Sequence, residues 1–328
     1  MQKIKIVWNP TDSPNLMREW FMPLVNQHFD FEEYSPDRQY STDTAVMTVY
    51  QTAWHTTDPW YAKLKDQGCA VIVDHLWDSD VDAPSSVENG ELVLRCGNWF
   101  WYRHCLQYLM VGYDQYQPQR DYQRAFLMLM NKQREHRDRA LSVLAPVLDR
   151  ALYSYVDRGI DVQHDFPRDG STRLHWTYSN NPAWYNQSFF SVVVESYMRT
   201  DAWNANPVLP NLKTEVNEKT FKTMVYYHPF ITYGSYEALA YLRREGFETF
   251  DNLWDESYDL ISKDQDRFDA VTHLVVDTVQ RFDRGELGID AVTEQKLAHN
   301  HQRFFDRALV EQRMATEIFD TIKEFVNA

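Results

Sequence analysis

The sequence predicts an α/β protein built from two consecutive units, each with a parallel sheet and covering helices. Short apolar runs bounded by polar or turn-forming residues recur along the chain, and stretches long enough for a helix separate them. This alternation is typical of parallel strands joined by helical crossovers. The periodicity breaks in the segment YDQYQPQRDY, residues 113–122, which divides the chain into an N-terminal and a C-terminal unit.

The N-terminal unit, residues 1–118, contains four β-like runs: residues 4–7, 45–49, 70–73 and the weaker run 92–94. The C-terminal unit, residues 119–290, contains four more: residues 125–130, 151–155, 189–194 and 229–233. Residues 291–328 show one long helical pattern, with apolar side chains recurring on one stripe. We expect this terminal helix to pack back on the N-terminal unit.

Composition limits the functional classes. A chain of 328 residues with 44% hydrophobic residues is long enough for two ordinary cores. The 11 tryptophans and 20 tyrosines suit clefts that hold sugars or bases, although most of them serve the core. A net charge of −15 opposes a broad nucleic-acid-binding surface but allows a local basic groove. Three cysteines without metal-ligand spacing favour the reducing cytoplasm, and neither a signal peptide nor a membrane-spanning run is expected.

The segment NEKTFKTMVYYHPFITYG, residues 217–234, predicts an amphipathic helix followed by a strand. Asn217 is the expected N-cap, and Glu218 and Lys219 fall in the first turn. Backbone N–H groups and the positive end of the helix dipole favour a phosphate there. Lys219 can add a charge, and Glu218 can accept hydrogen bonds from ribose hydroxyls. The alternative is an ordinary helix with a solvated charge pair.

The segment FLMLMNKQREHRDRALSVL, residues 126–144, predicts a strand, a polar turn and a helix. Asn131, Arg134 and Arg137 are candidate phosphate ligands because ligands bind at the carboxyl ends of strands in open α/β sheets. No GxGxxG or GxxxxGK[ST] fingerprint occurs in the chain. The alternative is a solvated, arginine-rich helix face.

Four segments within residues 126–260 resemble, in this order, a family of phage-type glycosyltransferases of the GT-B class. They are FLMLMNKQREHR, SFFSVVVES, NEKTFKTMVYYHPFITYG and LRREGFETFDNLWDESYD. More distantly, Glu195-Ser196 followed by Glu218-Lys219 is similar to the donor-binding region of GT-B fucosyltransferases. Asn217 departs from the family, which usually has Thr there, but both residues cap helices.

The resemblance implies two Rossmann-like domains facing across a cleft, with the acceptor on the N-terminal domain and a nucleotide-sugar donor on the C-terminal domain. The donor-binding residues that it implies are Asn131, Arg134, Arg137, Glu195, Ser196, Asn217, Glu218 and Lys219. The nucleotide sugar is a co-substrate, and neither a metal nor another cofactor is expected.

The resemblance also makes 5-hydroxymethylcytosine in phage DNA a candidate acceptor, with modified duplex DNA as the partner and the host cytoplasm as the location. A glycan or a small molecule is the alternative acceptor. A non-catalytic α/β nucleotide-binding protein is the alternative function.

An inverting transfer needs a general base at a strand end of the N-terminal unit. The segment AVIVDHLWDSD, residues 70–80, supplies Asp74, His75 and Asp78, of which Asp74 is favoured because an aspartate beside an aromatic ring can have a raised pKa. The alternative is a strand-end aspartate that caps a loop. The segment DSDVD, residues 78–82, fits a solvated loop better than a metal site, and GNWFWYRHC, residues 97–105, fits a buried helix better than an acceptor-stacking surface.

Overall fold

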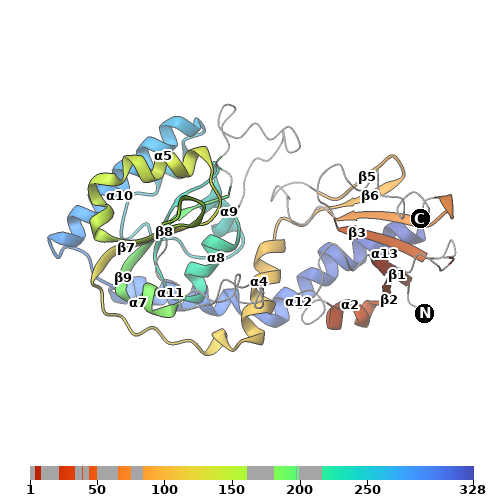
Figure 1. Ribbon diagram of the computed structural model, residues 1–328. Coiled ribbons are helices and arrows are strands. Elements are labelled where there is room, and N and C mark those ends of the chain that lie inside the picture. The colour runs from red at the N-terminus through yellow and green to blue at the C-terminus, as the bar shows by residue number, and fades with distance from the viewer. Residues whose placement is uncertain are drawn as a thin grey trace. The chain divides into compact units, whose positions relative to one another are not determined.

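The computed structural model describes residues 4–8, 22–33, 39, 44–49, 66–74, 84–160, 181–196, 198 and 216–328. The chain divides into two compact units, each with its own sheet (Figure 1). The first unit joins Met1–Met110 to Asp306–Ala328, and the second is Val111–Phe305. Residues 306–328 therefore pack with the N-terminal part of the chain, whereas residues 291–305 belong to the second unit.

The first unit contains a six-stranded sheet with the order β2-β1-β3-β4-β6-β5. Its strands are β1 Ile4–Trp8, β2 Phe29–Glu33, β3 Thr44–Val49, β4 Ala70–Asp74, β5 Ser86–Glu88 and β6 Glu91–Leu94. All neighbouring pairs are parallel except β5 and β6. The four runs expected in this region are thus confirmed as β1, β3, β4 and β6.

Strands β2 and β5 were not expected from the sequence. Strand β5 forms a hairpin with β6 through Asn89 and Gly90, which have φ values of 53° and 81°. Asn-Gly favours such a tight turn because both residues tolerate positive φ, so this dipeptide was an available signal for the hairpin.

The helical elements of the first unit are α2 Met22–His28, α4 Trp99–Met110, α12 Arg307–Met314, the π-helical segment η6 Ala315–Asp320, and α13 Thr321–Asn327. Trp99, Trp101 and Tyr102 of α4 are fully buried, which confirms the buried-helix interpretation. The Tyr102 hydroxyl donates to Glu317 Oε1 at 2.8 Å. The Phe319 ring centroid lies 4.7 Å from that of His28. Residues 306–328 are therefore part of this unit's core.

The continuous helix expected from residue 291 onward is wrong, because the chain forms separate helices on either side of Phe305. Helix α11, Ala291–Phe304, ends there. The Asp306 side chain then caps a new helix by accepting the Leu309 N–H at 3.0 Å. The apolar stripe continues across the break, which is why periodicity alone did not reveal it.

The second unit contains a four-stranded sheet with the order β10-β9-β7-β8, in which every neighbouring pair is parallel. Its strands are β7 Arg124–Met130, β8 Ala151–Tyr155, β9 Ser188–Val194 and β10 Phe230–Tyr233, which confirms the four expected runs. Its helical elements are η2 Tyr113–Gln115, α5 Glu135–Val143, η3 Ala145–Arg150, η4 Val156–Arg158, α7 Pro182–Gln187, α8 Glu218–Val225, α9 Ala238–Arg244, η5 Ser257–Leu260, α10 Asp264–Asp283 and α11.

The strand order places a topological switch point between β7 and β9. Strand β8, which follows β7 in the chain, pairs with one edge of β7. The next strand, β9, pairs with the other edge of β7. Loops that follow two such strands diverge and leave a crevice at their carboxyl ends, where open α/β sheets bind ligands. The residues that follow β7 and β9 are thus the first place to look for a site.

No helix among the described residues combines the length and the apolar composition that a membrane span requires.

Candidate functional site

Glu195 follows strand β9 directly, and its side chain is fully buried. Its Oε1 atom accepts hydrogen bonds from the Thr220 hydroxyl at 2.6 Å and from the Asn217 backbone N–H at 3.2 Å. Its Oε2 atom is also buried, and it has no hydrogen-bond partner within the described ranges. Burial raises the pKa of this carboxyl. Glu195 therefore attaches the start of helix α8 to the end of β9.

The first turn of α8 forms the polar network that the sequence predicts in outline. Asn217 is the N-cap, and its Oδ1 atom accepts the Lys219 N–H at 3.1 Å. The Lys219 ammonium donates to Ser196 Oγ at 2.9 Å, to Asn217 Oδ1 at 3.1 Å and to Glu218 Oε1 at 2.7 Å. The side chains of Glu218 and Lys219 remain partly exposed. The structure thus brings these four residues together beside Glu195.

The start of helix α5 supports the same strand end from the β7 side. The His136 Nε2–H donates to the Glu195 carbonyl at 3.0 Å, and burial lowers the pKa of this histidine to about 4. The buried Arg137 guanidinium donates to the carbonyls of Glu195, Val194 and Lys132, at 3.0, 3.3 and 2.9 Å. Arg137 therefore holds the backbone of the site, and its predicted contact with a ligand stays a prediction.

Asn131 and Arg134 occupy the end of β7. Asn131 is exposed, and its carbonyl accepts the Asp157 N–H at 3.0 Å. The Arg134 backbone N–H donates to the Tyr155 hydroxyl at 3.1 Å. After the larger effect of burial, the charge of Arg134 contributes to lowering the pKa of both His136 and Arg137, so it lies in the same electrostatic neighbourhood.

Among the described side chains whose charges act on one another around the start of α8, cations outnumber carboxyl groups. Arg134, Arg137, Lys219 and Lys222 face two carboxyl groups, Glu195 and Glu218, and burial disfavours the charged form of Glu195. A local positive excess on a chain with a net charge of −15 favours binding of an anion at this edge.

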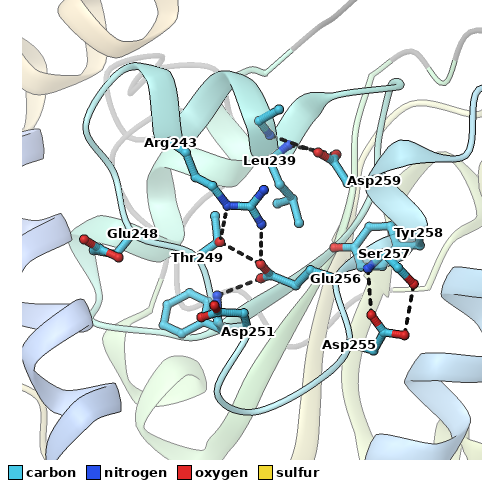
Figure 2. Close-up of polar contacts among 12 residues, drawn as sticks. Leu239, Arg243, Glu248, Thr249, Asp251, Asp255, Glu256, Ser257, Tyr258 and Asp259 are labelled. Atoms are coloured by element: carbon cyan, nitrogen blue, oxygen red, sulfur yellow. Dashed lines mark hydrogen bonds and ion pairs between the residues drawn. The ribbon is translucent and has the colours of Figure 1, made fainter.

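In the last resembling segment, residues 242–259, two carboxylates accept hydrogen bonds from nearby protein groups (Figure 2). Glu256 accepts from Arg243 Nη2 at 2.5 Å, from the Thr249 hydroxyl at 2.6 Å and from the Phe250 N–H at 2.7 Å. Asp259 accepts the Leu239 and Ala240 N–H groups, both at 2.9 Å. Asp259 therefore occupies the N-terminus of helix α9, so this segment has a structural role.

The candidate bases of the first unit cannot be placed in a site. Asp74 is the last residue of β4, where its backbone pairs with Val49 of β3 and Leu94 of β6. The Asp74 side chain, His75, Asp78 and the whole segment 78–82 lie outside the described residues. The assignment of the base stays a prediction.

Sequence reasoning did not select three residues of this edge: His136, Thr220 and Lys222. His136 and Thr220 lie in the first turns of α5 and α8, next to residues that were selected, and their contacts depend on a partner far away in the sequence. Within the described ranges, no group of three or more His, Cys, Asp or Glu side chains could hold a metal ion.

The likeness of this chain to solved structures is weak. No protein-family model matches the chain, and no curated protein matches it. Among solved structures, the chain is similar to an alpha1,3-fucosyltransferase crystallised with GDP-fucose, with a TM-score of 0.38 and 8% sequence identity over 93% of this chain and 91% of that chain. This likeness is too weak to assign a family, so membership of the phage-type family stays a prediction.

Proposed function

We propose that the protein is a glycosyltransferase that binds the diphosphate of a nucleotide-sugar donor at the carboxyl edge of the second sheet. The observation that carries this proposal is the position of the cations Arg134, Arg137 and Lys219. They lie where the strand order reverses between β7 and β9. Ligand sites of open α/β sheets lie at such switch points, and a diphosphate complements a positive excess.

Lys219, Arg134 and Glu218 have distinct roles in this proposal. Lys219 and Arg134 supply charge to the phosphates, and the start of α8 adds the positive end of its dipole. Glu218 is an acceptor for hydroxyl groups of the nucleoside or the sugar. Lys219 is paired with Glu218 at 2.7 Å, and in this proposal a phosphate oxygen takes the place of that carboxylate when the donor binds.

In the proposed reaction, an acceptor hydroxyl attacks the anomeric carbon of the donor sugar. The bond from that carbon to the phosphate oxygen breaks, its electron pair leaves with the nucleoside diphosphate, and a base takes the hydroxyl proton. Cations at the switch point stabilise the charge that develops on the leaving diphosphate. Asp74 stays the proposed base, and catalysis without a metal stays part of the proposal.

The acceptor is left open. The described residues offer no support for a hydroxymethylated DNA base, and the net charge of −15 opposes a broad DNA-binding surface. A glycan and a small molecule are the other acceptors to test.

Titration calorimetry with a panel of nucleotide sugars tests the proposal, with donor hydrolysis as the assay of turnover. We expect Lys219→Ala and Glu218→Ala to bind the donor more weakly, by about 1.5 to 3 kcal/mol for loss of a charged hydrogen bond. Both variants should stay folded, because these side chains are partly exposed. Lys263→Ala, which removes an exposed lysine paired with Asp266, is the matched control and should bind normally. Unchanged affinity in both site variants would refute the proposed donor site, and binding without turnover would favour a non-catalytic nucleotide-binding protein.

A further inference from the structure

Lys222 differs from the other lysines that the structure describes. Each of the others has a carboxylate oxygen within 4.0 Å; these are Lys5, Lys132, Lys219, Lys263, Lys296 and Lys323. In the described part of the chain, no hydrogen bond or ion pair engages the Lys222 ammonium, although the residue is partly buried. An ammonium without a partner in the protein is available to an anionic ligand.

Helix geometry places Lys222 beside the proposed phosphate site. Residues three and four apart share a helix face, so Lys222 lies on the same face of α8 as Lys219 and Glu218. The opposite face is buried and carries Thr220 and Met224. Side chains of a helix lean toward its N-terminus, which directs Lys222 toward the carboxyl edge of the sheet.

Within the part of the chain that the structure describes, this face carries two lysines and one glutamate. Glu218 is the carboxylate on the face, and it pairs with Lys219 at 2.7 Å. The Lys222 ammonium is therefore attracted by Glu218 without pairing with it, and it is repelled by Lys219. An anion with several oxygens can satisfy both ammonium groups at once, as a diphosphate does.

We propose that Lys222 is a second phosphate-binding cation, which contacts the diphosphate of the donor together with Lys219. This inference rests on the proposed function and extends it, because it makes the site selective for a diphosphate over a monophosphate. Two lysines three residues apart, on flexible side chains, can reach adjacent phosphate groups.

The ionisation of Lys222 agrees with this assignment. Burial lowers the pKa of its ammonium to about 8, an effect that the neighbouring Lys219 increases and Glu218 opposes. Because the pKa is lower in the folded than in the unfolded protein, charged Lys222 destabilises the fold below about pH 8. This cost disappears as the pH rises from about 8 toward the usual lysine pKa. Removing the charge should therefore stabilise the protein while it harms phosphate binding.

The test compares Lys222→Met, Lys222→Arg, Lys219→Met and the control Lys263→Met in the full chain. Calorimetry measures the affinity for inorganic pyrophosphate, UDP, GDP, UMP and GMP, and calorimetric scanning measures the melting temperature at pH 7. We expect Lys222→Met to weaken pyrophosphate and diphosphate binding about tenfold or more, with a smaller loss for monophosphates and an equal or higher melting temperature. Lys222→Arg should retain most of the affinity.

Distinct results separate this inference from the proposed function. Normal diphosphate binding by Lys222→Met, with loss in Lys219→Met, would overturn the role of Lys222 and leave the donor site intact. A lower melting temperature with equal losses for diphosphates and monophosphates would also overturn it, since Lys222 would then be structural. Pyrophosphate binding that needs both lysines, in a protein that binds no nucleotide sugar, would support the phosphate site and refute the glycosyltransferase.

Discussion

Glu195 joins three segments of the second unit through its carboxylate and its carbonyl oxygen. The carboxylate accepts hydrogen bonds from Asn217 and Thr220 at the start of α8. The carbonyl accepts hydrogen bonds from His136 and Arg137 at the start of α5. One residue thereby sets the distance between the two helix starts that carry the proposed phosphate ligands. Its buried Oε2 atom makes no compensating contact among the described residues, so the arrangement costs stability when the carboxyl is ionised.

We expect Glu195→Gln to be at least as stable as the wild type at neutral pH. The amide oxygen can still accept from Asn217 and Thr220, and the variant has no charge to desolvate. Since burial raises the pKa of Glu195, the wild type loses stability as the pH rises from the usual glutamate value through the raised pKa, and Glu195→Gln does not. Urea denaturation between pH 4 and 8 should show the variant's relative stability increasing with pH.

Glu195→Ala is the contrasting variant. It leaves the Asn217 N–H and the Thr220 hydroxyl without their acceptor and creates a cavity, so it should lose about 2 to 4 kcal/mol. A stability difference between Glu195→Gln and the wild type that does not change with pH would show that Glu195 does not titrate in this range.

At the scale of elements, α8 and α9 begin at the same edge of the second sheet but in different states. Asp259 occupies the N-terminus of α9 with two hydrogen bonds. The start of α8 is capped by the uncharged Asn217 side chain, which accepts a hydrogen bond from the Lys219 N–H. Of these two helices, α8 is the one with a lysine ammonium, that of Lys219, in its first turn, so it is the one that offers a cation to an anionic ligand.

Asp259→Ala should destabilise the second unit by about 1 to 2 kcal/mol, the range for loss of a helix cap. The matched control is Asp255→Ala, because Asp255 is exposed and accepts only local hydrogen bonds from Ser257 (Figure 2). We expect the control to change stability by less than about 0.5 kcal/mol. Equal urea midpoints for the two variants would contradict the structural role of Asp259.

At the scale of the whole molecule, the chain leaves the first unit at residue 110 and returns to it at residue 306. The returning segment buries apolar side chains in that unit: Val310, Met314, Ile318, Phe319 and Ile322. Burying each such side chain contributes about 1.5 to 3 kcal/mol, so together they match the whole stability of an ordinary domain.

A chain that ends at Phe305 should therefore lose the fold of its first unit. Limited proteolysis should cut the truncated chain within residues 1–110 much faster than the full chain, while residues 111–305 stay protected. Thr316→Ala, an exposed substitution in the returning segment, is the control and should leave the pattern unchanged. Equal protection of residues 1–110 in the truncated chain would show that this unit folds without its C-terminal segment.

Local sequence determined most strands, the capped start of α8 and the unit in which strand β7 is followed by a turn and helix α5. Apolar runs and side-chain caps act over a few residues, so they can be read without knowing the fold. The same reasoning missed β5, which has three residues, and β2, whose sequence FDFEE is mostly acidic and contains no apolar run. It also merged α11 with α12 because the apolar stripe crosses Asp306. Strand order, and with it the switch point between β7 and β9, was not readable in this way.

Only the tertiary structure decided which of the candidate residues meet and what each one does. Glu195 hydrogen-bonds with Thr220, and Arg137 is buried against the end of β9. Among the described lysines, Lys222 is the one that pairs with no carboxylate. Composition and spacing suggested a charged, phosphate-binding edge, but they gave these residues equivalent roles. The difference arises because burial and hydrogen bonding depend on strand order and helix packing, which join residues that are distant in the chain.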